Sequence, residues 1–227
     1  MKYKDFSGTT GVIIGTGPSL TGEQVDYIAE KRAAGECRVF GVNNAYKIAP
    51  FLDAFLACNI EWWDFYADEA QFEQFRFSYF NGDPNADMWT WDKHTARAYE
   101  INHVWGKWGN SFSTNPEFIH YGHGAGFQVL NLAYHYGIRN FVLVGYDMRY
   151  LPGYNRGSKK PGQGRHFFGE YPKSMQHWPR VGKEGEFTGL LKTFKTIDTR
   201  ALGINIVNCS PGSAMDFFET AELKDAL

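Results

Sequence analysis

The chain of 227 residues and 25.9 kDa fits one large domain, and its apolar share of 43% and charged share of 21% exclude a disordered, collagenous or coiled-coil protein. A formal net charge of −2 and a pI near 6.4 argue against a protein whose main role is to coat nucleic acid or an anionic membrane. The unusual number is the aromatic share of 17%, with 19 Phe, 13 Tyr and 7 Trp.

Short apolar runs alternate with segments of helical spacing along the chain. The first run, 11–15, predicts a strand, and the spacing of 22–34 predicts a helix after it. Further strands are predicted at 38–42, 53–58, 140–145 and 204–207, and further helices at 126–136, from about 186 to 202 and from about 213 to 223. This order predicts an α/β fold: a Rossmann-like, mostly parallel sheet with helices on both faces, in a single domain 1–227.

Two stretches interrupt the alternation. Residues 61–118 are rich in aromatic and poor in β-branched residues, and we predict an inserted subdomain there. Residues 151–186 are rich in Gly, Pro and basic residues, and a structureless segment of this length is usually functional or disordered. We interpret it as a basic lid over a ligand.

A glycine-rich turn, Gly15-Thr-Gly-Pro-Ser-Leu20, joins the first strand to the first helix. Ligands bind at the carboxyl ends of the strands in such sheets, and the amides of this turn could meet a phosphate. The turn is not a Walker motif, and it lacks the third glycine of the dinucleotide pattern. An ordinary turn capped by Ser19 or Thr21 remains the alternative.

Amide side chains follow the next two predicted strands, at Asn43, Asn44 and Asn59. Because amides both donate and accept hydrogen bonds, they suit a base, a ribose or a sugar hydroxyl. Their preference for turns is the alternative explanation.

Two histidines, His120 and His123, precede the central helix together with three small residues, 124–126. A zinc site lacks a third ligand of the usual spacing, so no metal is assigned. We expect the glycine amides to meet an anion and His123 to donate to it or titrate near neutral pH, with an exposed or core histidine as the alternative. The pair Asp83 and Asp87 could bind a divalent cation, or form a polar turn.

The lid and the later strand ends add further polar candidates. Arg165 and Arg180 offer forks for phosphate, and His177 offers a proton carrier. Asp147 could hold a ribose or sugar, and Ser210 could offer a hydroxyl to the same cleft or cap a helix.

The three cysteines are odd in number and lie in apolar runs, which predicts reduced core thiols. No apolar window approaches 18 residues, and the N-terminus lacks the pattern of a signal peptide. We therefore expect a cytoplasmic protein without a membrane span.

Taken in order, these segments resemble the bacterial CMP-sialic-acid-dependent sialyltransferase family and the wider sialyltransferase-like and Maf-flagellin-glycosyltransferase-like domains. Ile14-Gly-Thr-Gly-Pro-Ser-Leu20 is similar to the family's Gly-Asn-Gly-Pro-Ser-Leu, and Val42-Asn-Asn-Ala-Tyr46 to its Cys-Asn-Gln-Phe-Tyr. The region 126–147 resembles its helix, strand and Gly-Ile-Asp, and 204–213 resembles its closing strand and turn. The resemblance covers the scaffold and leaves out 61–118.

The resemblance implies a nucleotide-sugar-dependent glycosyltransferase that moves a sugar from a CMP-type donor, as substrate, to a hydroxyl acceptor. The chain departs from the family's Thr-Ser at Gly124 and Ala125, and it has Arg149 beside Tyr150 where the family has a tyrosine. The family's histidine is absent before the helix near Glu186, so the base would be His177, Glu186 or His123. The expected nucleotide and substrate contacts are Gly15, Thr16, Gly17, Pro18, Ser19, Asn43, Asn44, Asn59, Gly124, Ala125, Gly126, Asp147, Arg149, Tyr150, Arg165, Arg180 and Ser210.

Two other functions stay open. The same glycine turn resembles that of archaeal 6-hydroxymethylpterin pyrophosphokinase-like proteins, which implies ATP and Mg²⁺, with Asp83, Asp87 or Asp147 on the metal. A non-catalytic nucleotide-binding module is the third. We also expect the aromatic stretch to form either an acceptor platform or the subunit interface of a homo-oligomer.

Overall fold

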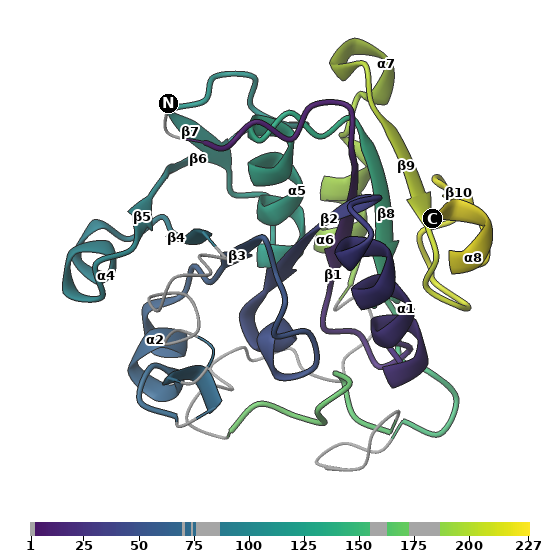
Figure 1. Cartoon of the computed structure of the whole chain (residues 1–227), viewed down its shortest axis with the longest axis horizontal. Coiled ribbons are helices and arrows are strands. Elements are labelled where there is room, and N and C mark those ends of the chain that lie inside the picture. The colour runs from purple at the N-terminus through teal and green to yellow at the C-terminus, as the bar shows by residue number, and fades with distance from the viewer. Residues whose placement is uncertain (1–2, 70, 74, 76–86, 155–162, 173–186) are drawn as a thin grey trace.

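The computed structural model describes residues 3–69, 71–73, 75, 87–154, 163–172 and 187–227 (Figure 1). Its strands are β1 (Thr10–Ile14), β2 (Cys37–Val42), β3 (Ala54–Leu56), β4 (Asp87–Thr90), β5 (Asn102–His103), β6 (Trp105–Lys107), β7 (Phe118–His120), β8 (Asn140–Val144), β9 (Asn205–Asn208) and β10 (Glu219–Thr220). Its helices are α1 (Gly22–Ala33), the 3₁₀-helix η1 (Asn43–Lys47), α2 (Ile60–Tyr66), α4 (Lys93–Ala98), α5 (Ala125–His135), α6 (Thr188–Lys195), α7 (Thr199–Leu202) and α8 (Leu223–Ala226).

The fold is α/β, with a parallel sheet at its centre, as the sequence predicts. In the described part of the chain, eight strands form one sheet in the order β10-β9-β8-β1-β2-β3-β4-β5, and every neighbouring pair is parallel. The chain runs outward from β1 through β2 and β3, then returns to the other side of β1 with β8. This reversal makes a topological switch point between β1 and β8, which is where open α/β sheets bind ligands.

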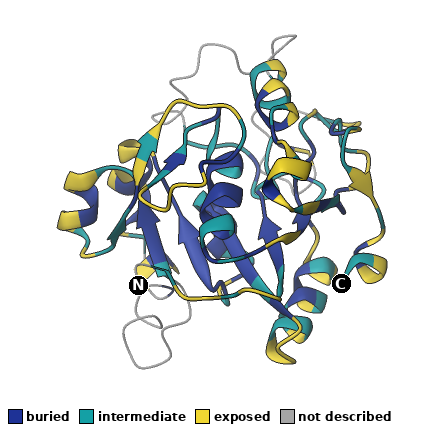
Figure 2. Ribbon diagram, turned by 90° about the horizontal axis from the view of Figure 1, so that it is seen from above, coloured by how far each residue is buried: buried dark blue, intermediate teal, exposed yellow. Residues whose placement is uncertain are grey.

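The central strands are buried on both faces, which explains their nearly continuous apolar sequences. Side chains of β1 alternate between two clusters: Val12 and Ile14 pack with Ile28 of α1, whereas Ile13 packs with Phe127 of α5. Figure 2 shows the sheet as a buried layer between partly exposed helices. Helices α1 and α5 therefore cover opposite faces of the sheet.

Helix α1 begins with a reciprocal capping box. The Thr21 hydroxyl accepts a hydrogen bond from the Gln24 amide, and the Gln24 side chain accepts one from the Thr21 amide, both at 3.2 Å. Because Thr21 fills this role, Ser19 is not the N-cap. The glycine-rich turn therefore ends before the helix begins.

Many of the aromatic side chains in the described residues lie in the core. Tyr46, Phe55, Trp62, Trp63 and Phe72 pack edge to face or tilted, with ring centroids 5.1–6.4 Å apart. Such pairs add to the free energy gained from burial. Part of the predicted insertion also continues the main sheet, since β4 and β5 extend its edge, while β6 pairs with β7 in a separate two-stranded sheet.

The prediction of a helix from about 213 to 223 is wrong. The Ser213 hydroxyl donates to the Tyr146 carbonyl at 2.6 Å, and the Ala214 amide donates to the Asp147 carbonyl at 2.8 Å, while Met215 is fully buried. These contacts fasten the segment across the end of β8. A turn, β10 and the short α8 form instead.

The helix expected from about 186 to 202 is broken into α6 and α7. The Thr196 hydroxyl donates to the Thr193 carbonyl at 2.7 Å, and the Asp198 carboxylate accepts from the Ala201 amide at 2.9 Å as the N-cap of α7. Local bonds of this kind compete with helix continuation. Residue 186 itself lies outside the described residues.

The three cysteines, Cys37, Cys58 and Cys209, are buried and form no disulfide, which agrees with the prediction of core thiols. Across the described ranges, none of the helices combines the length and apolarity that crossing a membrane requires.

Candidate functional site

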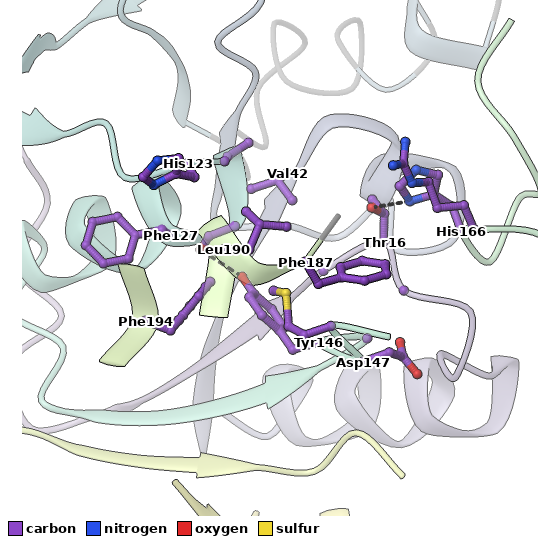
Figure 3. Close-up of a pocket in the computed structure, with 18 of the residues that line it drawn as sticks. Thr16, Val42, His123, Phe127, Tyr146, Asp147, His166, Phe187, Leu190 and Phe194 are labelled. Carbon is purple, nitrogen blue, oxygen red and sulfur yellow. Dashed lines mark hydrogen bonds between the residues drawn. The ribbon is translucent and has the colours of Figure 1, made fainter. Parts of the chain in front are cut away.

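A cavity of about 450 Å³ opens at the carboxyl ends of the strands, over the switch point (Figure 3). Its volume lies in the range of small-molecule sites. The turn after β1, the end of β2, the loop after β8 and the first turns of α5 and α6 all contribute to its wall. The lining residues are Gly15, Thr16, Gly17, Pro18, Val42, Asn43, His123, Gly124, Ala125, Gly126, Phe127, Gly145, Tyr146, Asp147, Met148, Arg149, Arg165, His166, Phe187, Gly189, Leu190 and Phe194.

The glycine-rich turn packs directly on the loop after β8. The Gly15 amide donates to the Val144 carbonyl and the Gly17 amide to the Gly145 carbonyl, both at 2.8 Å. A Cβ on Gly17 would lie 2.5 Å from the Gly145 oxygen and would also collide with the Asp147 carboxylate. These glycines therefore let two loops approach each other, and two of the amides expected at a phosphate are already hydrogen-bonded.

Asp147 is buried in the wall of the cavity, with 2% of its surface exposed. Its Oδ2 accepts from the Ser19 amide at 3.4 Å, whereas Oδ1 is buried and has no hydrogen-bond partner among the described residues. Burial raises the pKa of Asp147, opposed by the hydrogen bonds from Ser19 and the charge of Arg149. An unpartnered buried carboxylate oxygen suits a ligand hydroxyl.

Helices α5 and α6 both begin at the cavity without a side-chain cap. Their N-cap residues, Gly124 and Phe187, have no side-chain acceptor, and the helices are 11 and 8 residues long. A Cβ on Gly124 would meet Leu190 at 2.9 Å, so the two helix starts are in contact. The amides of a first helical turn lack intrahelical partners and favour an anion.

His123 is held by α6. Its Nδ1 lies 2.6 Å from the Thr193 hydroxyl, and that hydroxyl is 3.0 Å from the Gly189 carbonyl. Both contacts are satisfied together when Nδ1–H donates to Thr193 and Thr193 donates to Gly189. This network assigns the lone pair to Nε2, which makes no hydrogen bond within the described part of the chain.

The described part of the predicted lid is fastened to the glycine-rich turn. The Phe167 amide donates to the Thr16 carbonyl at 3.0 Å, and the Thr16 hydroxyl lies 3.0 Å from Nδ1 of His166. Burial, aided by the charge of Arg165, lowers the pKa of His166 to about 3. His166 is therefore neutral at pH 7, whereas Arg149 and Arg165 add positive charge to the described lining.

Three residues on the cavity wall have a positive φ: Asn43 at 48°, Met148 at 50° and Gly145 at 70°. A left-handed conformation is costly for methionine and less so for asparagine. Strained backbone of this kind concentrates at functional sites.

Several predicted site residues lie away from the cavity. Asn44 is buried and accepts from the Trp62 indole at 2.7 Å, while Asn59 is exposed before α2. Ser210 is buried and accepts from the Tyr146 amide at 2.7 Å, so it supports the wall from behind. Tyr150 contacts the ring of Phe187 with centroids 5.2 Å apart and stands behind a lining residue.

Of the two carboxylates of the metal-dependent alternative that the structure describes, Asp147 lies at the cavity and Asp87 does not. Asp87 begins β4 at the opposite edge of the sheet, where it accepts from the Tyr136 hydroxyl at 2.7 Å and pairs with Lys4 at 3.0 Å. Asp147 lines the cavity, and Asp83 lies outside the described residues, as do His177, Arg180 and Glu186.

The sequence did not single out the contribution of α6 to this wall. One signal was present, since a glycine inside a helical pattern is unfavourable relative to alanine and often has a packing reason. A Cβ on Gly189 would lie 3.3 Å from the His123 ring, so the glycine makes room for the imidazole. The apolar wall residues Phe127, Leu190 and Phe194 gave no such signal, because the same residues also belong to an ordinary core.

The chain was compared with known proteins. No protein-family model matches it. No curated protein matches it either.

Proposed function

We propose that the protein is a nucleotide-sugar-dependent glycosyltransferase of the sialyltransferase-like kind, which transfers a sugar to a hydroxyl acceptor. The observation that carries this proposal is the pairing of an oriented imidazole, His123, with an uncapped helix N-terminus on one wall of the same cavity. The reaction needs a base for the acceptor and a stabilised leaving phosphate, and this wall offers both.

The start of α5 is the proposed phosphate site. The amides of Ala125 and Gly126 are the first two of the helix, and the dipole of an 11-residue helix favours a negative charge there. Arg149 and Arg165 add two cationic side chains to the lining. In glycosyl transfer the leaving nucleotide gains negative charge, so fixed donors at this place stabilise the transition state more than the ground state.

Asp147 is the proposed contact for a sugar or ribose hydroxyl. Its Oδ1 is buried and without a hydrogen-bond partner among the described residues, and a ligand hydroxyl would satisfy it. Leaving such an acceptor unsatisfied costs about 1–3 kcal/mol, which a bound hydroxyl recovers.

His123 is the proposed general base. Nε2 takes the proton from the acceptor hydroxyl, and the acceptor oxygen forms the new bond to the anomeric carbon of the donor. The bond from that carbon to the phosphate oxygen breaks, and its electron pair stays on the departing phosphate. A neutral imidazole with Nδ1–H bound to Thr193 is in the protonation state that this step requires.

The test is a binding panel. Thermal shift and calorimetry with CMP, UDP, GDP and their sugars should give saturable binding for one nucleotide family. Arg149→Ala should weaken that binding, because it removes a cation from the cavity, whereas Arg97→Ala on the exposed side of α4 removes the same charge elsewhere and should not. The absence of a shift and of a calorimetric signal across the whole panel would overturn the proposal.

A further inference from the structure

Trp108 is exposed to an unusual degree for this chain. Its relative exposure is 75%, the highest of the large hydrophobic side chains in the described ranges, whereas Trp62, Trp63 and Trp89 are at 1% or below. Exposing an indole gives up the free energy of burial, so a tryptophan this exposed, in a protein that buries Trp62, Trp63 and Trp89, calls for an explanation.

The exposed indole is held in place from behind. Its ring packs against Tyr121 with centroids 5.4 Å apart and planes at 69°. The Tyr121 amide donates to the Lys107 carbonyl at 2.8 Å, and a Cβ on Gly106 would collide with the Tyr121 ring. On the other side of Trp108, a Cβ on Gly109 would also collide with the ring of His120. The backbone on either side of Trp108 therefore packs closely against the rings of Tyr121 and His120.

Trp108 also stands next to the cavity. Its ring centroid lies 6.1 Å from that of His123, with the planes at 63°, and His123 lines the cavity wall. His123 is also packed closely by Gly189 of α6. The candidate base therefore neighbours both α6 and an exposed aromatic side chain.

We propose that Trp108 is a stacking platform for a pyranose ring of the acceptor, which makes the acceptor a carbohydrate. This inference rests on the proposed function, since it supplies the second substrate of the same site. A pyranose has an apolar C–H face that packs on an indole, while its hydroxyls remain hydrated and can reach a neighbouring base. A rigid aromatic side chain loses little conformational entropy when it binds.

The test uses the indole N–H signals of ¹⁵N-labelled protein. The Trp108 signal is assigned by its loss in Trp108→Phe, and the Trp105 signal by its loss in Trp105→Phe. Trp105 is the matched control, because it is 52% exposed on β6 but packs on His103 instead of His123. Titration with the methyl pyranosides of glucose, galactose and mannose should move the Trp108 signal saturably for at least one glycoside and leave the Trp105 signal in place.

The affinity for that glycoside should fall at least tenfold in Trp108→Ala and be partly kept in Trp108→Phe, which retains an aromatic face. No movement with any glycoside, or equal movement of Trp105, overturns the platform. A Trp108 signal that depends only on protein concentration, with dimers in sedimentation, overturns it in favour of an interface between copies of this chain.

The nucleotide panel separates this inference from the proposed function. Nucleotide binding that persists in Trp108→Ala while the glycoside response is lost supports both. If the wild type binds a nucleotide but the Trp108 signal does not respond to any glycoside, the Trp108 platform is rejected and the proposed function stands. A glycoside response at Trp108 without any nucleotide binding supports the platform and removes the proposed donor chemistry.

Discussion

Nδ1 of His123 lies 2.6 Å from the Thr193 hydroxyl, although 70 residues separate the two in the sequence. Since the same hydroxyl lies 3.0 Å from the Gly189 carbonyl, α6 fixes both the orientation and the tautomer of the ring. Under the proposed function, Thr193 acts through His123 and is a positioning residue. Its hydroxyl would take the place of the carboxylate that orients histidine in many enzymes.

Thr193→Val should lower kcat in the transfer reaction, because valine keeps the shape of threonine but cannot accept from Nδ1–H. We expect His123→Ala to lower kcat by about 10²-fold or more, the usual contribution of a general base, and Thr193→Val to lower it by less. KM for the nucleotide sugar should change little in either variant. Thr193→Ser, which keeps the hydroxyl, should restore most of kcat.

The pH profile of kcat is the second measurement for this pair. Removing the Thr193 hydroxyl should move the acid limb of the profile, which a purely structural role would leave in place. A Thr193→Val enzyme with an unchanged profile and unchanged kcat would contradict the positioning role, even if His123→Ala were inactive.

Gly17→Ala should destabilise the protein, because a Cβ there would lie 2.5 Å from the Gly145 oxygen and would collide with the Asp147 carboxylate. Overpacking of this kind costs about 1–3 kcal/mol. Gly22→Ala is the matched control: nothing lies within 4 Å of its Cβ, and it begins α1. Urea denaturation should give it an unchanged free energy of unfolding, or one raised by up to about 1 kcal/mol.

The order of strands and helices could be predicted because both faces of the sheet are covered. A strand such as β1 is then continuously apolar from Val12 to Ile14, and Gly15 marks where it stops. The helix expected at 213–223 could not be excluded from the sequence, since nothing local reveals that Ser213 and Ala214 bond to the loop after β8. Tertiary hydrogen bonds overrode helical spacing there.

The candidate site could be predicted where it follows directly after a strand. Thr16, Asn43 and Asp147 line the cavity because parallel strands end at one edge. The sequence gives no reason to assign different roles to Asn43 and Asn44. The two are adjacent in η1, and the turn of that helix directs the Asn44 side chain to the Trp62 indole while Asn43 lines the cavity. The sequence predicts that the glycine turn cradles a phosphate through its amides, but the Gly15 and Gly17 amides pair with the carbonyls of Val144 and Gly145, more than 100 residues away in the sequence.

Asp147→Asn should stabilise the protein at neutral pH. Asparagine can keep an oxygen toward the Ser19 amide and place its NH₂ group where Oδ1 now has no partner among the described residues. Because burial raises the pKa of Asp147 in the folded protein, this carboxyl ionises in the unfolded chain first as the pH rises above 3.8. Its contribution to the free energy of unfolding is therefore complete at low pH and is lost as the pH rises through its folded pKa.

Chemical denaturation from pH 4 to 8 checks the direction of this pH dependence. The free energy of unfolding of Asp147→Asn minus that of the wild type should grow with pH and then level off. Asp198→Asn is the control, because its carboxylate caps α7 at an exposed site away from the cavity and should give no such rise. A difference that falls with pH would mean that Asp147 is stabilised as a carboxylate in the folded protein.

The buried imidazole of His166 should make the protein less stable in mild acid. Its folded pKa is lowered to about 3, so between about 6.5 and 3 the unfolded chain binds a proton that the folded protein excludes. The stabilising contribution of the neutral ring is therefore present above the unfolded pKa and declines as the pH falls through this window. His166→Gln, which cannot take up this proton, should flatten that decline.

His94→Gln is the matched control, since His94 is exposed on α4. The free energy of unfolding is measured by urea denaturation at pH 7, 6, 5 and 4. All variants carry Asp147→Asn, because the Asp147 carboxyl would otherwise add a pH dependence of opposite sign. We expect the His166→Gln curve to cross the parent curve as the pH falls, while the His94→Gln curve runs parallel to it. Parallel curves for both variants would show that the folded protein admits a proton at His166, and that the segment over Thr16 opens to water.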